Sequence, residues 1–135
     1  MMIDASALVA VLLREPEAVY LVQAIADARS PFTSPVALFE TTVALMRVNR
    51  WSAEKAEAAV RELLKTASIE VRAINDATAS LAASAFDRFG KGRNPAGLNL
   101  GDCFAYACAK ANDAPLLYKG GDFTKTDIQN AISPR

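Results

Sequence analysis

Short strand-like segments alternate with longer helical segments along this chain, and that order is the strongest constraint on its fold. The short segments are apolar, or alternate apolar with charged residues, and they lie at residues 2–4, 32–33, 69–74 and 115–118. Strands that are joined by helices pair in parallel, because right-handed crossovers return each strand in the same direction. The sequence therefore predicts an α/β domain with a largely parallel sheet whose strands all end at one edge.

The helices are predicted from apolar residues at helical spacing and from start signals. Ser34 and Pro35 are typical of the cap and first position of a helix that ends near Arg47. Ser52 starts another helix, which reaches about Ala67. The full set begins near residue 6 and continues with residues 16–28, 35–47, 52–67, 76–89 and 102–112. Apolar faces are expected on the second helix (Val19, Leu21, Val22, Ile25) and the fifth (Leu81, Ala82, Ala85, Phe86, Phe89).

Three segments between or after these elements complete the outline. Residues 90–101, GKGRNPAGLNLG, form a glycine-rich loop. Residues 119–123, KGGDF, form a turn after the strand at 115–118, and DIQNAI at 127–132 is expected to add a last edge strand. No linker divides the chain, so residues 1–135 are predicted to form a single domain.

Composition limits where the protein acts. Apolar runs fall well short of the ~20 residues that cross a bilayer, so no contact with a membrane is expected. No basic residue precedes the first apolar run, and we therefore expect a cytoplasmic protein rather than a secreted one. Cys103 and Cys108 lie on different faces of one predicted helix, which favours two small buried residues over a disulfide or a zinc site.

The chain contains no histidine. This absence excludes Ser-His-Asp and Cys-His nucleophilic catalysis, cleavage of RNA by a histidine pair, and histidine-based zinc sites. Carboxylates must therefore carry much of the chemistry if the protein is an enzyme. The net charge of zero also argues against binding of nucleic acid by bulk positive charge alone.

Four acids stand at unusual places, and each has an ordinary explanation when taken alone. Asp4 follows the first strand and could simply begin a turn, and Asp102 could cap the start of its helix. Glu40 borders an apolar helix face, where a structural salt bridge is the alternative. Asp122 could be an ordinary turn aspartate.

The same four acids have a common explanation if the sheet gathers them at one edge. Carboxylates that share a pocket repel one another and raise one another's pKa values. A hard divalent cation such as Mg²⁺ or Mn²⁺ relieves this repulsion, because it prefers oxygen ligands. One or two such ions activate water and stabilise charge on a scissile phosphate, with no need for histidine.

The segments that carry these acids resemble those of PIN domains, and most closely those of VapC-type toxin ribonucleases of bacterial toxin–antitoxin pairs. The resemblance extends from residue 2 to residue 128, in the order of the family's motifs. The matching segments are MIDASALVAVLL with Asp4, SPVALFETTVAL with Glu40, LNLGDCFAYACAKA with Asp102 and PLLYKGGDFTKTDI with Asp122.

The resemblance implies a fold, an activity and roles for particular residues. The fold is a three-layer α/β/α domain with a twisted, mainly parallel sheet, and the activity is Mg²⁺- or Mn²⁺-dependent endonucleolytic hydrolysis of RNA. Asp4, Glu40 and Asp102 would be the principal acids and metal ligands, with Asp122 as the fourth. Ser6 and Asp127 would support these ligands without contacting the metal ion, and Asp127 is also an alternative to Asp122 as the fourth acid. The residues expected to meet RNA phosphates, with solvated surface charge as the alternative, are Lys91, Arg93 and Lys119.

The resemblance also implies partners. These are an RNA substrate, a second copy of the chain in a homodimer or a larger toxin–antitoxin assembly, and a cognate VapB-like antitoxin. DNA would be contacted only through the antitoxin, whose basic side chain would enter the acidic pocket. The helices at 16–28 and 52–67 would offer the docking surfaces, with plain core packing as the alternative.

Two other functions remain open from the sequence. One is a catalytically idle PIN-like module that only binds a partner, which intact acids at all four positions disfavour. The other is a phosphohydrolase of the haloacid dehalogenase type, which also begins with a strand and an aspartate. That class normally has a second aspartate two residues later, where this chain has Ser6. The target RNA, the number of metal ions and the antitoxin's identity do not follow from the sequence.

Overall fold

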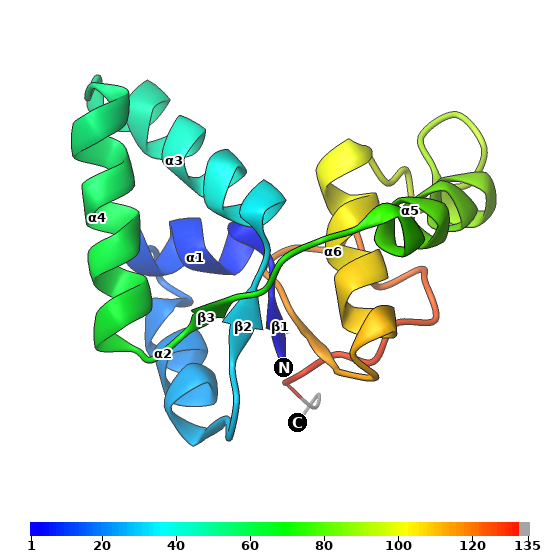
Figure 1. The fold of residues 1–135 in the computed structure, drawn as a ribbon, viewed down its shortest axis with the longest axis horizontal. Helices are drawn as coiled ribbons and strands as arrows, with labels where there is room; N and C mark the ends of the chain where they lie inside the picture. The colour runs from blue at the N-terminus through cyan, green and yellow to red at the C-terminus, as the bar shows by residue number, and fades with distance from the viewer. Residues whose placement is uncertain (133–135) are drawn as a thin grey trace.

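The computed structural model describes residues 1–132, and Figure 1 shows a central sheet with helices on both sides. The last three residues of the predicted 1–135 domain lie outside the described part. The strands are β1 (Met2–Ile3), β2 (Phe32–Thr33), β3 (Glu70–Val71) and β4 (Leu116–Leu117). They pair in the order β3-β2-β1-β4, and every pair is parallel. The predicted parallel α/β fold is confirmed.

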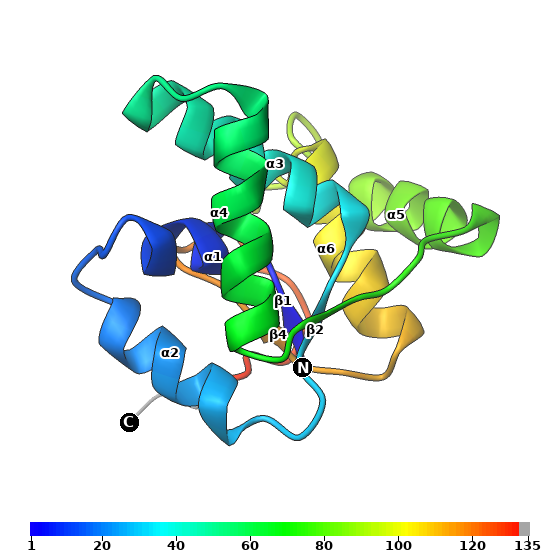
Figure 2. The ribbon, with the colours of Figure 1, turned by 60° about the vertical axis from the view of Figure 1, so that its left-hand side comes forward.

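Alternate residues of the strands pack into two separate hydrophobic cores, one on each face of the sheet. The sheet and the helices on its two faces are the three layers. Met2, Phe32 and Leu116 pack against α5 (Asp76–Phe89) and α6 (Leu100–Ala111). Ile3 and Leu117 point the other way. The helices on that face are α1 (Ala5–Leu12), α2 (Ala18–Asp27), α3 (Pro35–Asn49) and α4 (Ala53–Thr66). Figures 1 and 2 show α5 and α6 on the opposite side of the strands from α1, α2 and α4.

Capping side chains explain where the helices begin. Ser34 accepts a hydrogen bond from the Ala37 amide at 3.1 Å, with Pro35 at the first helical position, as predicted. Two starts differ from the prediction. Helix α2 begins at Ala18, after Pro16, and α6 begins at Leu100 because Asn99 rather than Asp102 is its cap.

Four residues expected on apolar core faces are exposed, and this part of the prediction was wrong. On α2, Leu21 and Ile25 are buried, whereas Val19 is 75% and Val22 is 49% exposed. Residues four apart share a helix face, but Val19 and Val22 point away from that face. On α5 the buried face contains Ala82, Ala85 and Phe89. Its flanking positions, Leu81 and Phe86, are 38% and 39% exposed.

The segment 127–132 does not form the predicted edge strand. It makes one isolated parallel bridge, between Asn130 and Leu116 of β4. Side chains in or next to the segment bond to nearby amides instead. The hydroxyl of Thr126, which directly precedes the segment, accepts from the Ile128 amide, and the Asn130 side chain accepts from the Ile132 amide. Such local bonds compete with a regular strand ladder.

Two expectations from composition can be compared with the structure. Cys103 and Cys108 are both free and buried, as expected. Among the helices of residues 1–132, none combines the length and the apolar character that a membrane span needs.

Candidate active site

The carboxyl ends of three neighbouring strands meet at one edge of the sheet, and the candidate site lies there. Asp4 directly follows β1, and its amide donates to the Leu117 carbonyl of β4 at 2.9 Å. The chain leaving β4 leads into the loop that carries Asp122. Helix α3, which carries Glu40, starts at the end of β2. The topology therefore brings residues separated by more than a hundred positions to one place.

Asp4 is held rigidly by the start of α1. Its Oδ2 atom accepts from the Ser6 amide at 3.1 Å and from the Ser6 hydroxyl at 2.6 Å, and its side chain is 5% exposed. The Ser6 hydroxyl in turn accepts from the Lys119 amide at 3.0 Å. Burial raises the pKa of Asp4 above its usual range, and the negative charge of Asp122 raises it further.

Glu40 lies in α3 with its carboxylate against the first turn of α6. Gly101 leaves the space for it, because a Cβ atom at position 101 would overlap all three carboxylate atoms of Glu40. The positive end of the α6 dipole favours a carboxylate at this place. Burial and the negative charges of Asp4 and Asp102 raise the pKa of Glu40 to about 7.

Asp102 is fixed by a reciprocal capping box at the start of α6. Its amide donates to Asn99 Oδ1 at 2.9 Å, and its Oδ2 atom accepts from the Asn99 amide at 3.1 Å. Burial and the charges of Asp4 and Asp122 raise the pKa of Asp102 to about 6. Asp102 therefore has an ordinary structural role as the third helical residue of the capping box, with Asn99 as the cap, but that role alone does not require two other acids nearby.

The four acids interact electrostatically. The pKa values of Asp4, Glu40 and Asp102 are raised, and the negative charges that contribute are those of Asp4, Asp102 and Asp122, so the four acids share one electrostatic site. Asp122 is exposed on its loop, whereas the other three are buried or half-buried. Within residues 1–132, no three or more Asp, Glu or Cys side chains are arranged so that together they could hold a metal ion. The all-oxygen donor set nevertheless fits Mg²⁺, which is commonly held by one or two carboxylates and keeps several waters.

Asp127 lies in a different cluster. It accepts a hydrogen bond from the Tyr106 hydroxyl at 2.5 Å, and Arg88 and Lys110 each approach it at 3.4 Å. The Tyr106 hydrogen bond and the two cations hold the pKa of Asp127 below its usual range. The neighbouring acids that raise the pKa values of Asp4, Glu40 and Asp102 include Asp122 but not Asp127.

The three cations predicted to contact RNA differ in how far acidic side chains of the protein already neutralise their charge. Lys119 Nζ lies 2.6 Å from Glu15 and 3.6 Å from Glu17, so its charge is compensated within the protein. Arg93 pairs with Asp87 at 3.0 Å on the surface. Lys91 is exposed in the loop between α5 and α6. Lys91 is consequently the member of the set best placed to attract a phosphate.

Sequence reasoning missed Gly101 as a member of the site. A glycine inside the first turn of a helix is a detectable signal, because glycine weakens helices and usually marks a close approach. Tyr106 was also missed, and only its distance to Asp127, 21 positions away, reveals its role.

The raised pKa values predict how stability depends on pH in the metal-free protein. Asp4, Glu40 and Asp102 bind protons more tightly in the folded state, so stability is present at low pH and is lost as pH rises through their folded pKa values. We expect the free energy of unfolding to fall between about pH 4 and pH 7, from the ordinary to the raised pKa values of these carboxyl groups, and Glu40→Gln to reduce that fall by about 1 kcal/mol after allowance for solvent screening.

Urea unfolding in buffers that contain EDTA measures this dependence. Glu62→Gln, which removes an exposed acid on α4, is the matched control and should leave the slope unchanged. A slope that is the same in the parent and in Glu40→Gln would contradict the assignment of mutual repulsion.

Comparisons with known proteins agree with this fold and identify its family. The model of the PIN domain family matches residues 1–129. Ribonuclease VapC of Mycolicibacterium smegmatis is 42% identical over 95% of this chain and 97% of its own length. Ribonuclease VapC30 of Mycobacterium tuberculosis is 39% identical over 99% of this chain and all of its own length. The crystal structure of Mycobacterium tuberculosis VapC20, a toxin described as cleaving the Sarcin-Ricin loop, superimposes with a TM-score of 0.74 at 15% identity, covering 98% of each chain.

The chain therefore belongs to the PIN domain family, and within it to the group of VapC ribonucleases. The family resemblance predicted from the sequence is confirmed, as is the three-layer fold. Membership of this family also leaves the haloacid dehalogenase interpretation without support.

Proposed function

We propose that the protein is the toxin of a type II toxin–antitoxin pair and acts as a Mg²⁺- or Mn²⁺-dependent endoribonuclease. The observation that carries the proposal is the group of four acids at one sheet edge, three of which have raised pKa values because of burial and of one another. Mutual repulsion among carboxylates in a half-buried pocket costs free energy, which a bound cationic ligand would offset.

Each acid contributes in a way that its surroundings define. Asp4 and Asp102 offer oxygens held in place by Ser6 and by Asn99, and Glu40 is held against the backbone of Gly101. Asp122 approaches from the loop after β4. A divalent cation bound among them would activate water and offset the charge that develops on the scissile phosphate.

The substrate in this proposal is a phosphodiester bond of RNA. Lys91 and Arg93 stand in the glycine-rich loop before α6, the helix that carries Asp102, so they would reach phosphates next to the cleaved one. We assign Lys119 a different part, because Glu15 and Glu17 already neutralise it. Its backbone amide supports Ser6, which in turn supports Asp4.

The proposed partners are an RNA, a second copy of the chain and a VapB-like antitoxin. Helix α2 supports a docking role, because Val19 and Tyr20 are 75% and 68% exposed. Helix α4 buries Ala56, Val60 and Leu64, so core packing accounts for its apolar face. The acids of this pocket repel one another, so they would also attract a basic side chain of an antitoxin, which would then compete with the metal ion.

Cleavage of total RNA by the purified protein tests the proposal. We expect cleavage with Mg²⁺ or Mn²⁺, none with EDTA, and recovery when the metal ion is restored. Calorimetry with Mn²⁺ should show binding by the parent and by the control Glu62→Gln. A protein that binds no Mn²⁺ and cuts no RNA would instead be an idle PIN-like module.

A further inference from the structure

We propose that Asp127 is a positioning residue, which fixes the loop that carries Asp122 by anchoring it to Tyr106 of α6. The inference rests on the proposed function, since it assigns Asp122 to the metal-dependent site. It gives Asp127 a role that differs from metal binding, although both aspartates lie in the same loop.

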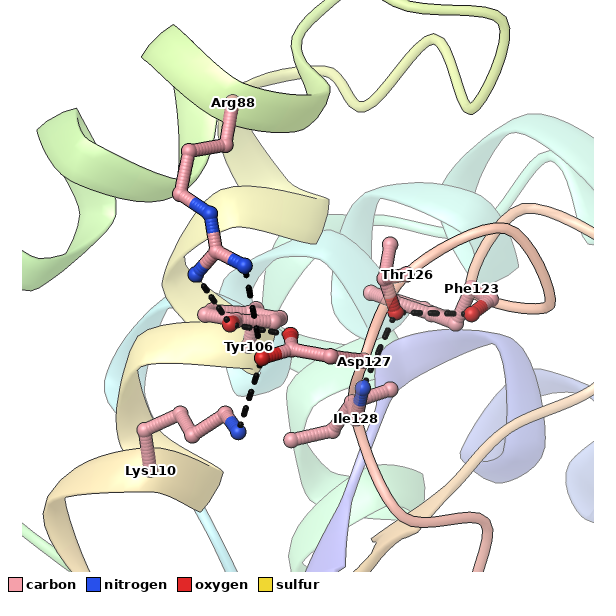
Figure 3. A network of polar contacts seen from close by, with 7 residues as sticks. All are labelled: Arg88, Tyr106, Lys110, Phe123, Thr126, Asp127 and Ile128. Atoms are coloured by element: carbon pink, nitrogen blue, oxygen red, sulfur yellow. Dashed lines mark hydrogen bonds and ion pairs between the residues drawn. The ribbon is translucent and has the colours of Figure 1, made fainter.

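The anchor is a short hydrogen bond between the loop and a buried side chain. The Tyr106 hydroxyl donates to Asp127 Oδ1 at 2.5 Å, and Figure 3 shows this contact between α6 and the chain after β4. Tyr106 is 4% exposed and packs against Phe89 of α5 with ring centroids 5.8 Å apart. The donor is therefore fixed by the core, so it is the loop that the bond positions.

Two cations strengthen this anchor. Arg88 of α5 and Lys110 of α6 converge on Asp127 Oδ2 from either side in Figure 3, each at 3.4 Å. Exposed ion pairs of this length contribute little by themselves. Together with the tyrosine they saturate the Asp127 carboxylate. Burial, together with the hydrogen bond to Asp127 and its negative charge, raises the pKa of Tyr106 to about 12, so the hydroxyl stays protonated and keeps donating.

The hydrogen bond at Asp127 also restrains Asp122, because the residues between the two aspartates form a compact unit with internal hydrogen bonds. The Thr126 hydroxyl donates to the Phe123 carbonyl at 2.7 Å, and the Thr124 hydroxyl donates to the Gly121 carbonyl at 2.6 Å. Phe123 is 3% exposed and packs against Tyr118 at 5.0 Å. Asp122 is thus held between an internal turn and a buried aromatic ring, with Asp127 fixing the far end.

The test compares two variants that break the anchor in different ways. Tyr106→Phe removes only the donor hydroxyl and keeps the buried ring, and Asp127→Ala removes the acceptor. We expect both to weaken Mn²⁺ binding, measured by calorimetry, by about tenfold, the size usual for groups that orient ligands. RNA cleavage should need correspondingly more Mg²⁺, with kcat at saturating Mg²⁺ close to that of the parent.

Hydrogen exchange of the metal-free protein gives a readout that does not depend on activity. The Thr124 and Thr126 amides, which donate within the loop, should exchange faster in both variants. Glu57→Gln, which breaks the exposed ion pair with Arg61 on α4, is the control and should change neither exchange nor metal binding. In an Asp122→Asn background, Asp127→Ala should weaken Mn²⁺ binding no further.

Three outcomes would overturn the inference. Unchanged exchange in the loop would show that Asp127 does not fix it, and faster exchange with unchanged Mn²⁺ affinity would show that the loop's position does not matter to the site. Weaker binding in Asp127→Ala but not in Tyr106→Phe would make Asp127 a ligand itself. Failure of the proposed function has a different signature, since the parent would then bind no Mn²⁺ at all.

Discussion

Asp4→Asn and Asp102→Asn should each lower RNA cleavage by more than about a hundredfold, above the 10–100-fold cost of losing a group that only orients ligands. Each substitution removes a negative charge from the site where three acids have raised pKa values. The amide oxygen of asparagine can still accept the hydrogen bonds from Ser6 or Asn99. The loss should therefore concern cation binding and not folding.

Stability separates this explanation from simple misfolding. Removal of one charge from a repelling group should leave the metal-free variants at least as stable as the parent at pH 8, while cleavage is lost. Thermal unfolding in EDTA, cleavage assays in Mg²⁺ and growth after induction measure the three properties. Glu62→Gln should match the parent in all of them, and full cleavage by either variant would show that the site is wrongly assigned.

The topology could be predicted from the sequence because it depends on the apolar pattern of whole segments and not on the position of any single residue. Apolar strands separated by helices predict parallel pairing, and parallel pairing predicts that Asp4 and the chain after β4 meet at one edge. The structure has this sheet, with β1 between β2 and β4. Helix starts at Ser34 and Ser52 were also predictable, since a capping hydroxyl acts on amides only three residues away.

Features that depend on the relative position of distant elements could not be predicted from the sequence. The exposure of Val19 depends on which side of α2 meets α1 and the sheet, and the periodicity of a short helix does not define that side. Lys119 looked free in the sequence, because its partners Glu15 and Glu17 are more than a hundred positions away. The same limit hid the Tyr106 anchor of Asp127 and the contact between Gly101 and Glu40.

Gly101→Ala should abolish most of the cleavage while leaving the fold intact. The added methyl group would overlap the Glu40 carboxylate, which stands at the end of a flexible side chain and can swing away. Alanine also favours the helix over glycine by about 1 kcal/mol. We therefore expect a free energy of unfolding within about 1 kcal/mol of the parent's, together with a loss of cleavage as large as that of Glu40→Ala.

A double-mutant cycle identifies Glu40 as the cause of that loss. If the methyl group acts by displacing Glu40, then Gly101→Ala should add nothing to the loss of cleavage in Glu40→Ala, because the displaced carboxylate is already absent. It should also stabilise that variant, since the overlap is gone and only the gain in helix propensity remains. Glu40→Gln keeps the size of the side chain, so the methyl group should stabilise it less. Full activity of Gly101→Ala would mean that Glu40 acts from another position, whereas a further loss in the Glu40→Ala background would place a second function, such as approach of the RNA backbone, at the first turn of α6.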